Sequence, residues 1–177
     1  FTSAGFTHNG IAVSGGSGVQ ISNNTIGFSS LNGTGTYSLV GLSSSKWIPV
    51  DINSGTSGAP TEIQGNRVAN ISYTGAMSGT SSSTPLAVFR LSGGVINMGT
   101  IAGNIVGDSL VNASITYSSN SASSSDFNAF YLSSAGASIN MRNNFAGGIE
   151  AALNGTGGVR IFGIQTAGTT LLDCRFN

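Results

Sequence analysis

A short pattern of apolar and polar positions recurs five times along this chain of 177 residues. An apolar or small residue is followed two positions later by a second apolar residue, and three positions after that by an asparagine. The second positions are Ile21, Ile63, Ile101, Met141 and Cys174, and the asparagines are Asn24, Asn66, Asn104, Asn144 and Asn177. Recurrence at intervals of 33 to 42 residues is typical of stacked repeat architectures.

A second pattern alternates with the first, and it consists of an extended apolar stretch that ends in small residues. Ile11–Val13 before Ser14-Gly15-Gly16 and Val88–Leu91 before Ser92-Gly93-Gly94 are examples. Apolar residues that alternate with Ser, Thr or Asn indicate short strands. Residues 61–98 read as one repeat of three strands with a polar loop at 74–85. We therefore predict an all-β fold for residues 1–177, a parallel β-helix of about five rungs of three short strands with variable loops.

Stacking would place like residues above one another. We expect the five second positions to form a core column and the five asparagines to form a ladder, because an amide both donates and accepts hydrogen bonds. The alternative is that the asparagines bind sugar or metal. Cys174 occupies a core slot and is the only cysteine, so we interpret it as a small core residue rather than a reactive thiol.

Composition narrows the classes of function. Only 7% of the residues are charged, 39% are hydrophobic, and the net charge is zero. The six basic residues are isolated from one another, which argues against nucleic-acid binding. No apolar run approaches the roughly 18 residues of a membrane span. A neutral surface rich in Ser, Thr, Asn and Gly suits a secreted or cell-surface protein.

The carboxylates do not suggest a catalytic site. Glycosidases need two carboxylates close together, but the six acidic residues do not occupy matching positions in successive repeats. We predict no enzyme activity, no metal and no cofactor. His8 reads as a turn residue before a strand. The longest loop is predicted at 43–60, where Lys46, Trp47 and Asp51 are candidate binding residues. The alternative is that Trp47 packs its loop against the wall of the helix.

Three segments carry a family resemblance: Val19–Gly27, Ile63–Ser72 and Ile101–Asp108. They resemble repeats of right-handed parallel β-helices of the pectate-lyase-like superfamily. The longer period looks like that of large secreted repeat proteins exported by the type IX system, which implies an adhesin or surface fibre. Asp108-Ser109-Leu110 matches the pattern on which bacteria with this export system attach O-glycans to exported proteins, so Ser109 is a candidate modification site.

The leading hypothesis is thus a non-catalytic structural or adhesive segment of a longer repetitive chain. Its expected partners are other segments of the same chain, neighbouring copies, surface glycans or an export machinery. The alternatives are the scaffold part of a polysaccharide-active β-helix enzyme or phage tailspike, and a subunit of a self-assembling extracellular filament.

Overall fold

The computed structural model describes the whole chain except residues 1, 4, 134–137, 169–170 and 176–177. Its strands form four sheets, and all the strand pairs are parallel. Sheet A contains β1 (Thr2–Ser3), β5 (Tyr37–Gly41), β9 (Ile71–Gly75), β13 (Ile115–Ser119) and β17 (Ile149–Leu153). Sheet B contains β2 (Thr7–Ser14), β6 (Lys46–Asn53), β10 (Leu86–Gly93), β14 (Ser125–Leu132) and β18 (Val159–Thr166).

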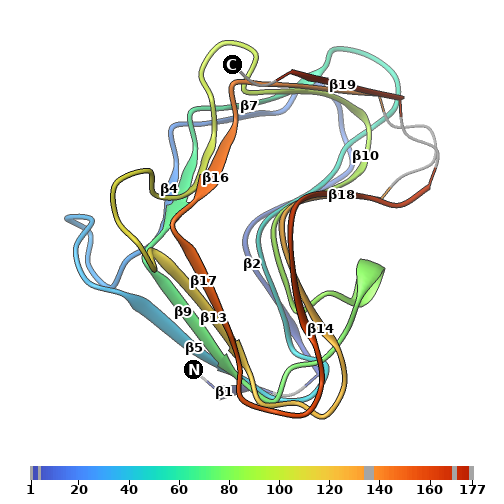
Figure 1. Cartoon of the computed structure of the whole chain (residues 1–177). Helices are drawn as coiled ribbons and strands as arrows, with labels where there is room; N and C mark the ends of the chain where they lie inside the picture. The colour runs from blue at the N-terminus through green and yellow to red at the C-terminus, as the bar shows by residue number, and fades with distance from the viewer. Residues whose placement is uncertain (1, 4, 134–137, 169–170, 176–177) are drawn as a thin grey trace.

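Sheet C contains β3 (Gln20–Ser22), β7 (Thr61–Gln64), β11 (Val95–Met98), β15 (Ser138–Arg142) and β19 (Leu171–Arg175). Sheet D contains β4 (Thr25–Gly27), β8 (Arg67–Ala69), β12 (Ile105–Gly107) and β16 (Phe145–Gly147). A 3-10 turn, η1 (Ser81–Ser83), lies between β9 and β10. The chain visits sheets A, B, C and D in turn and then stacks the next strand on the first, as Figure 1 shows. The predicted all-β parallel β-helix of about five rungs is confirmed.

Each of the first four rungs has four strands rather than the three that the sequence suggested, and the described part of the fifth rung has β17, β18 and β19. The difference arises at residues 68–73, where the apolar positions Val68, Ile71 and Tyr73 predict a single strand. Asn70 lies in the left-handed region with φ 52°, where an extended strand cannot continue, and it separates β8 from β9. Asparagine tolerates this conformation better than most residues, so a single residue turns the chain from sheet D into sheet A.

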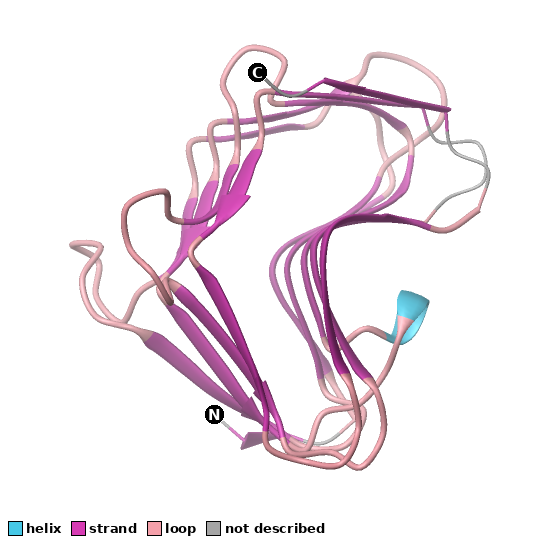
Figure 2. Ribbon diagram, viewed as in Figure 1, coloured by secondary structure: helices cyan, strands magenta, loops and turns pink. Residues whose placement is uncertain are grey.

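Sheet B gives the solenoid its cross-section. Its strands have eight residues each and bend toward the interior, so that the outer face of the sheet is concave (Figures 1 and 2). Along β14 all eight residues are buried. We call the concave outer face of sheet B the crease. The turn η1 lies beside it, on the outer side of the sheet.

Stacked apolar side chains fill the interior. Ile21 opposes Ile63, Ile63 opposes Met98, Met98 opposes Met141, and Met141 opposes Cys174. The prediction that Ile101 belongs to this column is wrong, because its side chain is 83% exposed and lies outside any strand. Met98 takes the slot since this repeat has three extra residues in the turn before Asn104. The recurring sequence pattern therefore located the ladder asparagine of this repeat correctly but assigned the wrong residue to the core position of the strand.

The interpretation of residues 43–60 as the longest loop is also wrong. The middle of this segment is β6, whose outward residues Lys46 and Asp51 made it look like a loop. Leu42–Ser45 is the short corner before it. The corner between sheets A and B is longer at residues 76–85, which include η1. Strand β6 escaped detection because Pro49 interrupts its apolar pattern.

Candidate functional site

The asparagine ladder runs through the corner between sheets C and D. Asn24 Nδ2 donates to Asn66 Oδ1 at 2.9 Å, Asn66 Nδ2 to Asn104 Oδ1 at 2.9 Å, and Asn104 Nδ2 to Asn144 Oδ1 at 2.8 Å. Each of these carbonyl oxygens also accepts the backbone N–H of the preceding asparagine at 3.0 Å. Asn177 lies outside the described residues. The ladder is thus a structural element, and its amides are occupied by one another.

Asn104 is fully buried, and Asn66 is 1% exposed. A buried amide with four bonding positions is costly unless they are filled. Asn66 Nδ2 also donates to Ile21 O and Asn104 Nδ2 to Ile63 O, which joins the side chains to the preceding rung. This leaves these two amides no capacity for a sugar or a metal ion.

Charged side chains also join neighbouring rungs. Arg90 holds Asp51 through two hydrogen bonds, of 2.8 Å from Nε and 2.5 Å from Nη2. Arg67 Nη2 lies 2.5 Å from Asp108 Oδ2. The other two clusters are Arg160 with Asp126, at 2.8 and 3.0 Å, and Arg142 and Arg175 with Asp173, at 3.3 and 3.0 Å. Four of the six acidic residues are therefore bound by arginine.

These contacts lower the pKa of two carboxyl groups. Two backbone N–H groups, of Leu110 first and then of Val111, together with Arg67, lower the pKa of Asp108. Arg175, and then Arg142, lower the pKa of Asp173. Groups that stay ionised and paired stabilise structure and are poor proton donors. Among the described residues, no cluster of three or more His, Cys, Asp or Glu could hold a metal ion.

The structure separates the three candidate loop residues. Trp47 points into the core and is 4% exposed, with its ring centroid 5.8 Å from that of Tyr37 and 6.4 Å from that of Tyr73. Lys46 faces outward, and its Nζ donates to Ser82 O at 3.2 Å. Burial, and then the charge of Arg90, lower the pKa of Lys46. A loop site built on Lys46, Trp47 and Asp51 therefore does not form, and Trp47 follows the packing alternative.

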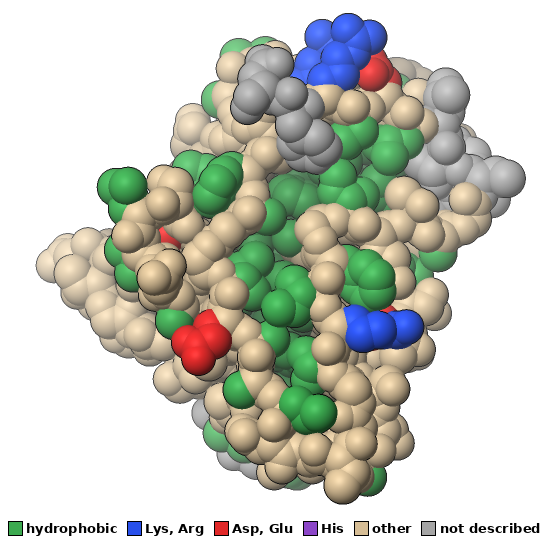
Figure 3. Space-filling model, in the orientation of Figure 1, with side chains coloured by type: hydrophobic (Ala, Val, Ile, Leu, Met, Phe, Trp, Pro, Cys, Tyr) green, Lys and Arg blue, Asp and Glu red, His purple; other side chains and the backbone are tan. Residues whose placement is uncertain are grey.

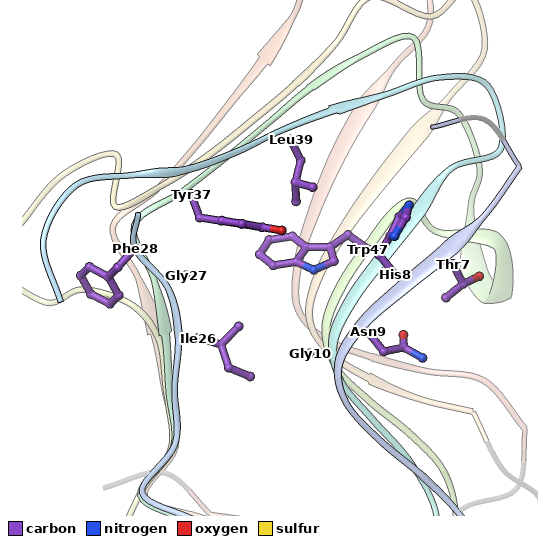
Figure 4. A pocket seen from close by; sticks show the side chains of 10 residues that line it. All are labelled: Thr7, His8, Asn9, Gly10, Ile26, Gly27, Phe28, Tyr37, Leu39 and Trp47. Atoms are coloured by element: carbon purple, nitrogen blue, oxygen red, sulfur yellow. The ribbon is translucent and has the colours of Figure 1, made fainter. Parts of the chain in front are cut away.

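A cavity of about 500 Å³ lies beside Trp47, in the first turn of the solenoid. Strand β1 pairs with β5 only at Val40 and Gly41, so the other end of β5 has no described neighbour on that side. Tyr37, Leu39 and Trp47 project into the space, as Figure 4 shows. His8 comes from β2 toward the same interior, so it is a strand residue and not the predicted turn residue. The lining is mixed: apolar and aromatic side chains on one side face the polar residues Thr7, His8 and Asn9 of β2.

Two further sequence candidates have simple surroundings. Cys174 is half-buried in the core column, and burial raises the pKa of its thiol, as does the neighbouring Asp173. A thiol held protonated in this way is a poor nucleophile. Ser109 is exposed in the turn that Asp108 closes by accepting the N–H of Leu110. A modifying enzyme could reach this hydroxyl.

The sequence reading missed the polar residues of the crease. Asp126, Asn128 and Tyr131 face outward from β14, because Phe127 and Phe130 face the core. Asn128 is fully buried, yet neither its Oδ1 nor its Nδ2 has a hydrogen-bond partner. Nothing in the local sequence marks these residues, since the bend of sheet B is what brings them together.

Comparisons with known proteins identify no relative. No family model matches the chain, and neither a curated protein nor a solved structure matches it. None of the described helices is long and apolar enough to cross a membrane. The fold is a parallel β-solenoid.

Proposed function

We propose that this chain is a non-catalytic structural or adhesive segment of a large secreted or cell-surface repeat protein. One observation carries the proposal: the charged side chains are used to connect rungs. Asp51, Asp108, Asp126 and Asp173 each bind an arginine from an adjacent strand of the same sheet or the same strand. Glu62 accepts hydrogen bonds from Gln64 and Asn97 in the same way.

A hydrolytic site needs carboxylates with the opposite properties. One must stay free to attack or to accept a proton, and the other must hold its proton near neutral pH. Arginine partners lower carboxyl pKa values and occupy the oxygen atoms. The carboxylates named above are therefore suited to holding the stack together.

The resemblance of the repeats to right-handed β-helices of the pectate-lyase-like superfamily also supports the proposal. The longer period resembles that of secreted repeat proteins of the type IX kind, in which such segments act as adhesins or surface fibres. An exposed Ser109 in the Asp108-Ser109-Leu110 sequence agrees with O-glycosylation on the outside of a cell. The proposed partners are surface glycans, neighbouring segments and an export machinery.

The experiment compares cleavage with adhesion. The purified chain is incubated with neutral and acidic polysaccharides, and new reducing ends and unsaturated products are measured. In parallel, its retention on bacterial cells and on immobilised glycans is measured. We expect retention without cleavage. Cleavage that disappears in an Asp126→Asn or Glu150→Gln variant would contradict the proposal and favour the scaffold of a polysaccharide-active enzyme or tailspike.

Self-assembly into a filament is a second candidate, and a specific feature favours it. The ladder has a direction, because the Nδ2 groups of Asn24, Asn66 and Asn104 each donate to the asparagine of the next rung. At the first rung, Asn24 Oδ1 has no donor among the described residues. On the opposite face, formed by the last turn, apolar side chains run through the middle of the surface (Figure 3). Sedimentation velocity at rising concentration tests this candidate. A sedimentation coefficient that increases with concentration favours assembly, and a constant monomer value counts against it.

A further inference from the structure

The crease concentrates polar atoms that lack partners. On β14, Asn128 opposes Phe162 of β18, and Tyr131 opposes Gln165 of the same strand. The outer face of sheet B is concave here, as Figure 2 shows. Gln165 Oε1 is buried without a hydrogen-bond partner, as are both polar atoms of Asn128.

A buried donor or acceptor without a partner destabilises the fold, because it has lost its hydrogen bonds to water and gained none in return. Asn128 carries one of each kind. Elsewhere on the outer surface comparable amides are satisfied. Gln64 donates to Glu62 and Thr100, and Asn97 donates to Glu62. The unsatisfied amides of Asn128 and Gln165 are therefore a feature of the crease, and they point to an external partner for their hydrogen bonds.

The third hydrogen-bonding group is the hydroxyl of Tyr131. Its only described contact is with Ser81 Oγ of η1, at 3.4 Å. That separation is long for two hydroxyl groups, which prefer about 2.7–2.8 Å. The turn itself is anchored beside the crease, where Ser81 N donates to Asp126 Oδ2 at 3.1 Å. A ligand hydroxyl could thus replace Ser81 at Tyr131 at small cost.

The charged residues at β14 and β18 are paired within the protein: Arg160 binds Asp126 through two hydrogen bonds. On neighbouring strands of the same sheet, Arg90 binds Asp51 through two more, and the Lys46 ammonium donates to Ser82 O at 3.2 Å. An anionic ligand such as a uronate or a phosphate would therefore find no free cation between β14 and β18. The Arg160 guanidinium lies 5.5 Å from the centroid of the Phe162 ring, which is half-buried and offers an apolar surface at the edge of the crease.

We propose that the crease between β14 and β18 binds an uncharged carbohydrate. Asn128 donates and accepts hydrogen bonds with adjacent ring hydroxyls, Gln165 Oε1 and the Tyr131 hydroxyl receive further ones, and Phe162 packs against the sugar ring. A hydroxyl both donates and accepts, which matches this set of atoms. Entry to Asn128 requires the exposed Arg160 side chain and the η1 turn to move aside. The inference rests on the proposed adhesive function and names the class of glycan.

The test titrates the whole chain with neutral hexasaccharides of glucose, xylose, mannose and N-acetylglucosamine, with hexagalacturonate as the anionic comparison. Calorimetry measures affinity, and NMR follows the side-chain amide signals of Asn128 and Gln165. We expect at least one neutral hexasaccharide to bind better than the anionic one and to shift both amide signals. Asn128→Leu and Gln165→Leu should each weaken binding about tenfold or more, which corresponds to about 1.4 kcal/mol.

The control is Gln20→Leu, because Gln20 is exposed on β3, in sheet C. It should bind like the unaltered chain. Melting temperature separates folding from binding: Asn128→Leu removes an unsatisfied buried amide and should keep or raise it. If this variant does not fold, Gln165→Leu and Phe162→Ala, at half-buried side chains, decide the question.

Three results would overturn the inference: no neutral hexasaccharide binds, the crease variants bind normally, or an extended peptide binds the crease in place of sugars. These results leave the proposed function intact, since adhesion could use another surface. Cleavage of the sugars would instead contradict the non-catalytic function, whatever the crease variants do. The two failures are therefore distinguishable.

Discussion

Replacing Asn104 by alanine tests how much the ladder contributes to stability. The change removes four hydrogen bonds: two that Asn104 Nδ2 donates, at 2.8 and 2.9 Å, and two that its Oδ1 accepts, at 2.9 and 3.0 Å. Not every partner is left empty. Ile63 O still accepts the N–H of Gly99, and Asn144 Oδ1 still accepts the N–H of Asn104.

The backbone N–H of Asn66 is the group that loses its acceptor, and it is buried. At about 1 kcal/mol for each bond lost, and with this donor left unsatisfied, Asn104→Ala should cost about 4 kcal/mol. The matched control is Asn24→Ala, at the half-buried end of the ladder. It removes one ladder bond of 2.9 Å and an exposed bond of 3.3 Å to Ser22 O, and it leaves Asn66 Oδ1 with the N–H of Asn24, so it should cost about 1 kcal/mol.

Urea unfolding followed by circular dichroism and by the fluorescence of Trp47 measures both values. Trp47 is the only tryptophan and is buried in β6, so its signal reports loss of the core. Equal costs for the two variants, or a cost of Asn104→Ala below that of Asn24→Ala, would refute the reasoning. That outcome would mean that the amides contribute little beyond the strand ladders around them.

Three other predictions concern the core, the turns and the response to acid. Met98→Ala should cost about 2–5 kcal/mol because Met98 is fully buried, whereas Ile101→Ser should change stability by less than about 0.5 kcal/mol in the same urea assay. Gly107→Ala should cost about 3 kcal/mol or more, because φ is +81° and a Cβ would lie 1.8 Å from Gly147 O. Gly33→Ala should cost only about 1–2 kcal/mol, because φ is +69° but the space around it is open. Thermal melts that rank the two variants the other way would contradict this. The pKa of Asp108 is lowered in the fold, so its carboxylate stabilises the folded state above the unfolded pKa of about 3.9, and this stabilisation is lost as pH falls through the lowered value. Asp108→Asn should remove that part of the dependence of unfolding free energy on pH. An unchanged acid profile would count against the prediction.

The difference between Met98 and Ile101 shows where sequence reasoning succeeded and where it stopped. Asn104 could be placed in the ladder because its role depends on its position in a repeat. The neighbouring core position could not, because three extra turn residues moved the strand relative to the asparagine. The location of Trp47 in a strand or a loop was similarly ambiguous. Lys46 and Asp51, which face outward from the strand, give this segment a polar sequence like that of a loop. Only the register with β2 and β10 shows that it is a strand.

The sequence by itself determined the repeat, the β class, the stacking and the asparagine ladder, because these follow from local alternation and from the spacing of similar residues. The tertiary structure decided the fourth strand of the first four rungs, the arginine–aspartate contacts between rungs and the crease. Those depend on which residues from different rungs become neighbours and on how far sheet B bends. Asn128 illustrates the distinction: in the sequence it is one asparagine among many, and in the fold it is a buried amide without a partner.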